Sequence, residues 1–212
     1  MRYPNLIFDL DDTLIDSFGQ YVAAHQRVAA ELSLRVPSRD ELVVYLSTWE
    51  ETLQRLWPGV DPAPFMARYL TLVTQYPYPA VPGVRATLAK LRELGHHLTI
   101  VTKRSRRHLA LRMEQAELPM ALFDGIFAVE DQPAPKPDPR CFEPVWELLG
   151  EARPERCLYV GDRLDDQRAA AGAGITFVAV GTGPEGLAVF DGHVPKSHQL
   201  DSAAQLDAWL SR

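Results

Sequence analysis

Two different patterns of apolar residues divide this chain into parts. Short, nearly continuous apolar runs predict buried strands at residues 5–9, 97–102, 123–130, 156–162 and 175–183. Apolar residues at helical spacing predict helices at residues 20–32, 39–57, 61–76, 84–94, 106–118, 139–150, 165–174 and 202–210. After the first strand, about residues 16–81 contain no convincing strand, whereas strands and helices alternate in the rest of the chain.

This alternation predicts an α/β fold, a Rossmann-like doubly wound parallel sheet with helices on both faces. The first strand and residues 82–212 would form this domain, so the core is expected at 1–15 and 82–212. Residues 16–81 would form a small helical domain inserted after the first strand, and the segment YPYPAVPG marks the return of the chain to the core. Both ends of the insert would lie near the carboxyl edge of the sheet, where such folds bind ligands.

Composition narrows the class of protein. The chain has 212 residues, a net charge of −6 and 46% hydrophobic residues, which fits a soluble globular protein and argues against nucleic acid or an anionic membrane as a partner. No apolar run is long enough for a membrane helix, and the first residues do not resemble a signal peptide, so we expect a cytoplasmic protein. Cys141 and Cys157 are expected to be reduced core residues. The oligomeric state cannot be read from the sequence.

Polar residues follow four of the predicted strands or the loops after them. Because parallel strands end at one edge of a sheet, these residues are expected to converge there. They are Asp9 and Asp11, Thr102, Lys136, and Asp162, Asp165 and Asp166. Lys136 is one of only four lysines and stands between two prolines, which stiffen the loop around a rare charge.

The converging side chains favour phosphoryl chemistry. Several carboxylates form a site for a hard divalent cation such as Mg²⁺, which would offset their mutual repulsion. A threonine hydroxyl and a lysine ammonium group suit a phosphoryl group, whose oxygens carry negative charge in the transition state. Two carboxylates two residues apart can divide the work: one attacks phosphorus, and the other transfers protons.

These motifs resemble those of the haloacid dehalogenase superfamily of hydrolases, in its phosphoglycolate-phosphatase-like branch. LIFDLDDTL at residues 6–14 is similar to the first motif, and LTIVT, ending in Thr102, is similar to the second. Lys136 corresponds to the third motif, and VGDRLDD at residues 160–166 to the fourth. The insert after the first motif resembles the helical type-1 cap of that branch, which supplies substrate specificity.

The resemblance implies a role for each motif residue. Asp9 would be the nucleophile that forms an aspartyl-phosphate, and Asp11 the general acid/base. Thr102 would bind the phosphate, and Lys136 would neutralise the phosphate and the nucleophile. The implied Mg²⁺ ligands are Asp9, Asp11 through its backbone carbonyl, and Asp162.

Asp166 would support the site by orienting Lys136 or a metal-bound water. Three residues depart from the common family pattern. Asp12 stands where glycine is commoner and is expected to stabilise the turn. For Lys103 the sequence leaves open a contact with phosphate or a place in solvent, and Arg163 is not expected to take part in chemistry.

Several residues near these motifs have simpler interpretations. The basic run from Lys103 to His108 is interpreted as a solvated helix face. His96 and His97 are expected at the surface, away from the site. In the insert, Trp49 and Trp57 are interpreted as core residues, and His25 is not assigned to substrate binding.

The sequence thus predicts a Mg²⁺-dependent phosphatase acting on a small phosphorylated metabolite through an aspartyl-phosphate. Asp11 argues against a dehalogenase, and the absence of lysine from residues 16–81 argues against a phosphonatase that needs a cap lysine. A phosphomutase and a non-catalytic protein that binds phosphorylated ligands remain as alternatives. Phosphoglycolate, a nucleoside monophosphate, a sugar phosphate and pyrophosphate all remain possible substrates.

Overall fold

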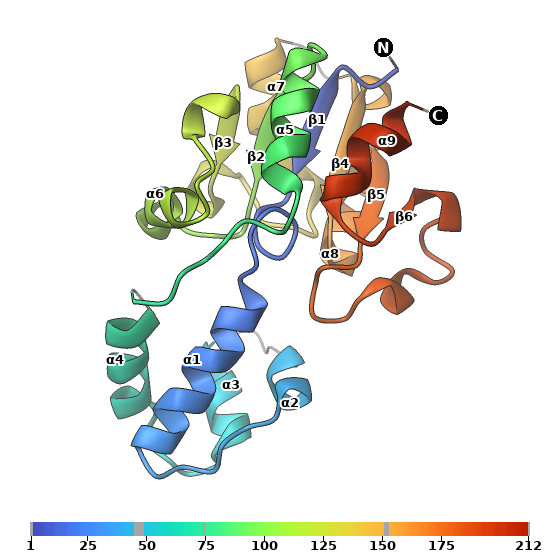
Figure 1. The fold of residues 1–212 in the computed structure, drawn as a ribbon. Helices are drawn as coiled ribbons and strands as arrows, with labels where there is room; N and C mark the ends of the chain where they lie inside the picture. The colour runs from blue at the N-terminus through green and yellow to red at the C-terminus, as the bar shows by residue number, and fades with distance from the viewer. Residues whose placement is uncertain (1, 45–48, 74, 151–152, 212) are drawn as a thin grey trace. The chain divides into compact units, whose positions relative to one another are not determined.

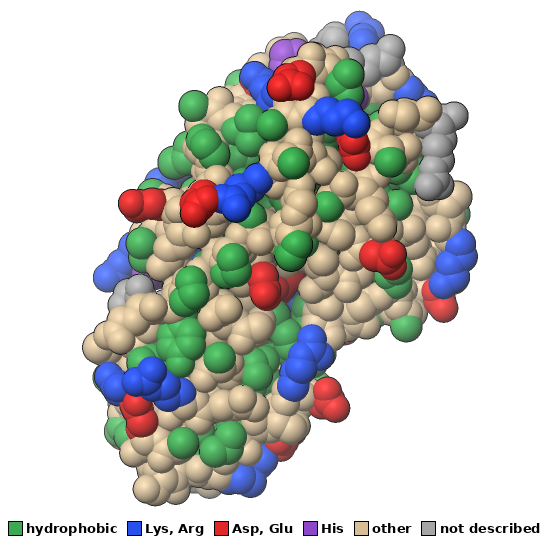
Figure 2. All heavy atoms as spheres, viewed as in Figure 1, with side chains coloured by type: hydrophobic (Ala, Val, Ile, Leu, Met, Phe, Trp, Pro, Cys, Tyr) green, Lys and Arg blue, Asp and Glu red, His purple; other side chains and the backbone are tan. Residues whose placement is uncertain are grey.

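The computed structural model describes residues 2–44, 49–73, 75–150 and 153–211. The chain forms two compact units (Figure 1). The first comprises Met1–Asp16 and Pro79–Arg212, and the second comprises Ser17–Tyr78. No helix in the described ranges is both long enough and apolar enough to cross a lipid bilayer. Figure 2 shows acidic and basic side chains scattered among apolar ones over the face in view.

The first unit is built on a six-stranded sheet in the order β3-β2-β1-β4-β5-β6, in which every paired strand is parallel. Its strands are β1 (Asn5–Phe8), β2 (His97–Val101), β3 (Gly125–Phe127), β4 (Cys157–Gly161), β5 (Thr176–Val180) and β6 (Gln199–Leu200). The predicted parallel α/β fold is therefore confirmed. The chain adds β2 and β3 on one side of β1 and β4 to β6 on the other, so the strand order reverses at β1 and β4.

Helices cover both faces of this sheet. α5 (Val84–Glu93) and α9 (Leu206–Leu210) lie on one face, and α7 (Glu143–Leu149) and α8 (Leu164–Ala173) lie on the other (Figure 1). α6 (Arg106–Gln115) follows β2. The predicted helices at 139–150 and 202–210 each begin as a 3₁₀ turn, Pro139–Phe142 and Ala203–Gln205. The side chains of Asp138 and Ser202 cap these turns.

The strands are buried because both sheet faces are covered. Tyr159 on β4 and Phe177 on β5 pack with Phe142 and Phe190 in one core cluster. Cys141 and Cys157 are free thiols in the same cluster, as the sequence predicts. The short strand β6 was not predicted, because two residues give no readable alternation.

The second unit contains α1 (Phe18–Glu31), α2 (Arg39–Val43), α3 (Trp49–Leu56) and α4 (Pro62–Val73). The single helix expected over residues 39–57 is wrong. A capping box between Ser38 and Glu41 starts α2, and the extended backbone of Val44, at ψ 92°, ends it. Residues 45–48 of that prediction lie outside the described residues.

The interior of the helical unit is aromatic. The His25 ring is fully buried, 4.0 Å from the Tyr21 ring and 4.6 Å from the Tyr69 ring, measured between centroids. Trp57 is also buried, and its indole N–H donates to the carbonyl of Arg35. Trp57 is therefore a core residue, as expected, and His25 belongs to the same core.

Candidate active site

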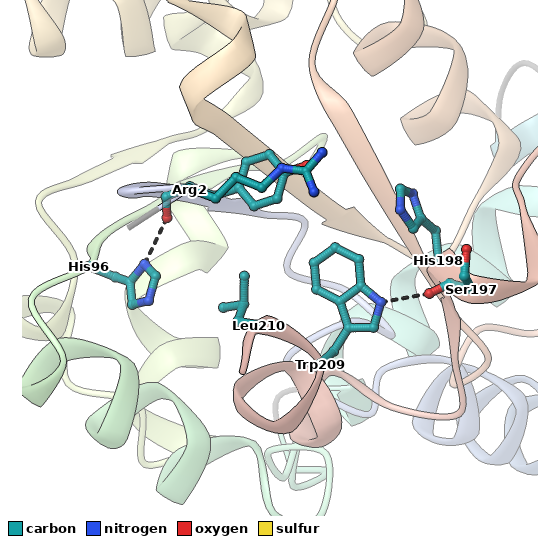
Figure 3. Close-up of a pocket in the computed structure, with 7 residues that line it drawn as sticks. Arg2, His96, Ser197, His198, Trp209 and Leu210 are labelled. Carbon is teal, nitrogen blue, oxygen red and sulfur yellow. Dashed lines mark hydrogen bonds between the residues drawn. The ribbon is translucent and has the colours of Figure 1, made fainter. Parts of the chain in front are cut away.

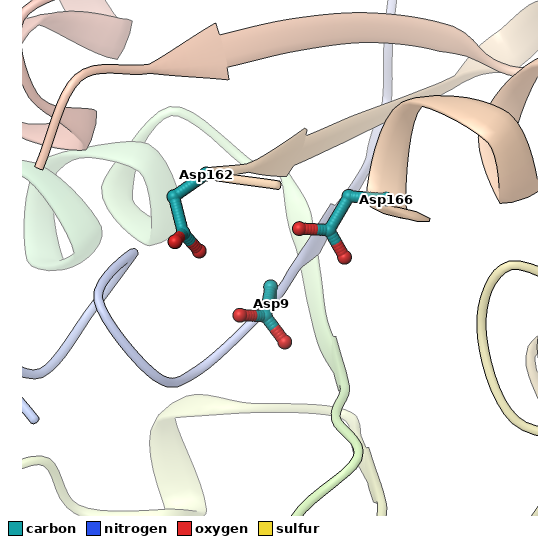
Figure 4. Close-up of side chains that lie close together, drawn as sticks. All are labelled: Asp9, Asp162 and Asp166. Atoms are coloured by element: carbon teal, nitrogen blue, oxygen red, sulfur yellow. The ribbon is translucent and has the colours of Figure 1, made fainter. Parts of the chain in front are cut away.

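Three aspartates converge at the carboxyl edge of the sheet, where β1 and β4 end (Figure 4). Asp9 follows β1 directly, and its N–H extends the ladder by donating to Val160 of β4 at 2.9 Å. Asp162 follows β4, and Asp166 lies in the first turn of α8. One carboxylate oxygen from each of the three lies within 4.8 Å of the others, and all three residues are buried. The strand ends thus bring together residues more than 150 positions apart.

Lys136 enters this cluster from the loop before α7. Its ammonium group donates to Asp9 Oδ1 at 2.5 Å, to Asp166 Oδ1 at 2.6 Å and to the Tyr159 hydroxyl at 2.8 Å. The Tyr159 hydroxyl in turn donates to Asp166 Oδ1 at 2.8 Å. A lysine has three N–H donors, and all three have acceptors here. Sequence reasoning missed Tyr159, because a tyrosine in an apolar strand cannot be told from an ordinary core residue.

The electrostatics of the cluster reflect burial and crowding. Burial raises the pKa of Asp9 to about 7, an effect that Lys136 opposes and Asp166 reinforces. Burial lowers the pKa of Lys136, but the two carboxylates outweigh it, so the net shift is upward. Lys136 is therefore held as a cation, but this one positive charge does not balance the negative charges of the three carboxylates.

Asp162 is the carboxylate of the cluster whose charge is least compensated. Thr13 donates to its Oδ1 at 3.0 Å, but Oδ2 is buried and has no hydrogen-bond partner within the described part of the chain. Burial, and then the neighbouring carboxylates Asp9 and Asp166, raise the pKa of Asp162 well above its usual value. A buried carboxylate oxygen without a donor is costly unless a cation binds it. The donor set, all hard oxygens, fits a magnesium-like ion.

Thr102 follows β2 and is buried at the same edge of the sheet. Its hydroxyl accepts a hydrogen bond from the backbone N–H of Arg104 at 3.1 Å. Its carbonyl accepts from the Gln132 side chain at 2.7 Å, and that side chain also donates to Phe127 and Ala128. Gln132 therefore ties the end of β2 to the loop after β3, a role that no local sequence signal indicates.

The carboxylate of Asp11 lies outside the cluster of Asp9, Asp162 and Asp166, which we call the metal-type cluster. It pairs with Arg104. Arg104 Nε donates to Asp11 Oδ2 at 2.9 Å, and a second guanidinium nitrogen donates to Oδ1. The interpretation of the basic run as a solvated helix face is wrong for Arg104, whose side chain is only 18% exposed. It holds for Arg106, which is 61% exposed. Lys103 pairs with Asp165 at 2.6 Å near the surface.

Two departures from the family pattern have structural explanations. Asp12 adopts a left-handed backbone conformation with φ of +59°, which aspartate tolerates better than most residues, and its carbonyl accepts from Thr182. Arg163 contributes its backbone N–H, which donates to Asp166 Oδ2 at 3.0 Å, while its side chain is 43% exposed. Any residue except proline can supply that N–H.

A separate depression lies at the amino ends of the strands (Figure 3). Its lining includes Arg2, His96, His198 and Trp209, and none of the predicted site residues. The expectation that His96 is a surface residue is wrong: the residue is buried, and its Nδ1 lies 2.9 Å from the carbonyl oxygen of Tyr3. This contact holds the ring against the segment just before β1. His97, in contrast, is exposed.

Residues 6–180 match the family model described as haloacid dehalogenase-like hydrolase. The chain therefore belongs to the haloacid dehalogenase-like hydrolases, and the resemblance of the sequence to that superfamily is confirmed.

Named relatives agree with this assignment. A phosphoglycolate phosphatase of Pseudomonas syringae is 30% identical over 198 residues, which cover 86% of this chain and 71% of the relative. Pyrophosphatase PpaX of Bacillus mycoides is 25% identical over 219 residues, which cover 100% of this chain and 99% of the relative. The chain is thus a hydrolase with phosphatases among its relatives.

A solved structure supports the fold. A family hydrolase from Deinococcus radiodurans, described with bound phosphate and sodium, superposes with a TM-score of 0.81 at 25% identity. The alignment covers 99% of this chain and 96% of that one.

Proposed function

We propose that this chain is a Mg²⁺-dependent phosphatase that hydrolyses a small phosphorylated metabolite through an aspartyl-phosphate on Asp9. The observation that carries the proposal is the buried cluster of Asp9, Asp162 and Asp166 around the ammonium group of Lys136. Relatives named phosphoglycolate phosphatase and pyrophosphatase support the same reaction class.

The first half of the reaction transfers the phosphoryl group to the protein. A carboxylate oxygen of Asp9 attacks phosphorus, the bond to the leaving oxygen breaks, and Asp11 gives that oxygen a proton. Lys136 keeps Asp9 oriented and neutralises charge on the phosphoryl oxygens, and the Thr102 hydroxyl donates to one of them.

The second half regenerates the nucleophile. Asp11 accepts a proton from a water molecule, whose oxygen attacks phosphorus and breaks its bond to Asp9. Inorganic phosphate leaves, and Asp9 returns to its carboxylate form. Each proton taken from water in this step replaces one lost to the leaving group, so Asp11 ends the cycle as it began.

Mg²⁺ would be held by the carboxylates of Asp9 and Asp162, and it would supply positive charge that balances the phosphoryl oxygens. The buried Oδ2 of Asp162, which has no hydrogen-bond partner among the residues that the structure describes, supports this assignment. The backbone carbonyl of Asp11 stays a predicted ligand. Asp166, whose Oδ1 accepts from Lys136 and Tyr159, is assigned to orienting Lys136.

The helical insert, residues 16–81 in the boundaries set by the sequence, is assigned as the substrate-selecting cap. For the substrate, the names of the relatives favour phosphoglycolate and pyrophosphate among the compounds that the sequence leaves open.

The experiment is phosphate release from a panel of phosphorylated metabolites, measured with Mg²⁺ and with EDTA. We expect release that requires the metal and is concentrated on one or two compounds. Asp9→Asn should lower kcat by at least about 10⁴-fold, the scale seen when a nucleophile is removed. Its matched control is Asp165→Asn, because Asp165 is an acidic residue of the same sheet edge that pairs with two partly exposed cations, Lys103 and Arg168.

Full activity of Asp9→Asn would refute the mechanism. Release of phosphate in EDTA at the full rate would refute the metal dependence. Transfer of the phosphoryl group to a second hydroxyl of the substrate, without release of phosphate, would favour the phosphomutase alternative.

A further inference from the structure

The guanidinium group of Arg104 donates hydrogen bonds from two of its nitrogens to the two oxygens of the Asp11 carboxylate. Two parallel N–H···O bonds between arginine and a carboxylate form a strong, directional pair. The two residues are 93 positions apart and follow different strands, β2 and β1. Asp11 is thus held in one orientation by a cation from the neighbouring strand end.

The backbone of Arg104 is fixed as well. Its N–H donates to the Thr102 hydroxyl at 3.1 Å, and its carbonyl accepts from the N–H of Val129 at 3.2 Å. Arg104 therefore contacts both the proposed phosphate-binding residue and the proposed acid/base. The backbone position from which its side chain extends is therefore fixed by hydrogen bonds to Thr102 and Val129.

The neighbouring cations are less suited to contact a ligand beside Asp11. Lys136 is 4% exposed, and its three N–H donors already have acceptors. Lys103 is 46% exposed and pairs with Asp165, and Arg106 is 61% exposed and pairs with Asp131. Arg104, at 18%, is enclosed enough to be oriented yet accessible to a ligand.

We propose that Arg104 is a specificity-determining residue that binds a second anionic group on the leaving-group side of the substrate. This inference rests on the proposed function, in which Asp11 faces the leaving oxygen. Because Arg104 contacts Asp11, its guanidinium group lies beside the atoms that follow the leaving oxygen. The substrate class is a short phosphate ester or anhydride whose leaving group carries its own carboxylate or phosphate.

The substrate would exchange with Asp11 for the same guanidinium group. Its second anion would take over the paired N–H donors, so Arg104 stays paired, and the Asp11 carboxyl group is released toward the leaving oxygen. A neutral leaving group cannot displace Asp11 in this way, since it offers no charge to replace the carboxylate. The same residue would therefore select the substrate and release the acid/base only for the selected one.

The test compares kcat/KM for phosphoglycolate and for its carboxamide, whose leaving group is neutral, with pyrophosphate as a second compound whose leaving group is anionic. We expect the wild-type enzyme to prefer phosphoglycolate over the amide by about 50-fold or more, the scale of a charge-assisted pair. Arg104→Gln should reduce this preference to within about 3-fold, chiefly by slowing the charged substrates. Arg104→Lys should restore part of it, because lysine keeps the charge but loses the fork.

Arg106→Gln is the matched control, since Arg106 is an exposed arginine two residues away, and its preference should equal that of the wild type. Thermal unfolding checks that each variant is folded. A wild-type enzyme without preference, or an equal loss on both compounds in Arg104→Gln, would overturn the inference while Asp9-dependent phosphate release left the proposed function standing. Hydrolysis of no compound at all would overturn both.

Discussion

The ammonium nitrogen of Lys136 lies 2.5 Å from Oδ1 of Asp9, although 127 residues separate the two along the chain. Both side chains are less than a tenth exposed. The pair has a second carboxylate, Asp166, on the other side of the ammonium group at 2.6 Å. A single cation thus stabilises two buried anions, and its removal would leave both of them unpaired.

Lys136→Met should therefore destabilise the fold as well as abolish activity. Removing one partner of a buried ion pair costs about 3–5 kcal/mol, because the remaining charge stays buried. We expect a loss of this size in the free energy of unfolding, measured by urea denaturation in EDTA. Lys103→Met is the control, since its pair with Asp165 is near the surface and should contribute less than about 1 kcal/mol. Equal losses in the two variants would contradict the buried pair.

Tyr159→Phe tests the hydroxyl that joins Lys136 to Asp166. The substitution keeps the ring, which packs against Phe142 at a centroid distance of 5.0 Å, and removes only one oxygen. We expect a loss of about 1–3 kcal/mol in stability, because Lys136 is left with an unmet donor. We also expect a fall in kcat with little change in KM, since the orientation of Lys136 is loosened. An unchanged kcat would mean that the two carboxylates alone hold the lysine.

Much of this site could be predicted from the sequence because the signals are local. A polar residue directly after an apolar run marks a strand end, and parallel strand ends meet at one edge. Lys136 was recognisable as a rare charge between two prolines. Asp9, Thr102 and Asp162 were recognisable because each directly follows an apolar strand. The structure places these three residues and Lys136 at that edge.

The partners of these residues could not be predicted, because they depend on contacts across long separations. Tyr159 reads as core in an apolar strand, and Arg104 reads as one of several solvated charges. Their roles come from neighbours 23 and 93 positions away. Local pattern also failed where backbone geometry overrides it: Val44 ends α2 although the apolar spacing continues through it.

Gly183 provides a test of the metal-type cluster. A Cβ added there would overlap Oδ2 of Asp162, so the buried carboxylate would have to move. Gly183→Ala should weaken Mg²⁺ binding, measured as the metal concentration for half-maximal activity, by about 10-fold or more, with a stability cost of about 1–3 kcal/mol.

Gly181→Ala is the matched control for that experiment. Its added Cβ would lie 2.9 Å from the Leu187 side chain, so the overlap is milder than at Gly183 and meets an apolar group. We expect a smaller loss of stability than in Gly183→Ala, with the metal requirement unchanged. If both variants shifted the metal requirement equally, the effect would belong to the loop and not to Asp162.

His25 makes the stability of the helical unit depend on pH. Burial lowers the pKa of His25 to about 4, and the hydrogen bond to the Tyr21 carbonyl opposes this only in part. Trp49, Phe65 and Tyr69 surround the rest of the ring and offer no charge to offset a proton. Because the unfolded chain takes up this proton near pH 6.5 and the folded chain only near pH 4, stability should fall as the pH drops through that window. The loss is about 2–3 kcal/mol between pH 7 and 4.5, at about 1.4 kcal/mol per pH unit.

The measurement is the free energy of unfolding by urea at pH 7 and at pH 4.5, for the wild type and for His25→Gln. The variant starts less stable, because it disturbs an aromatic core, but its loss between the two pH values should be smaller by that same amount, since glutamine does not titrate. His97→Gln is the control for the substitution itself: His97 is more than half exposed, so this change replaces a histidine without disturbing the aromatic core. A His25→Gln variant with the full wild-type loss would show that other groups bind the protons on unfolding, and the buried ring would then have to be charged in the folded state.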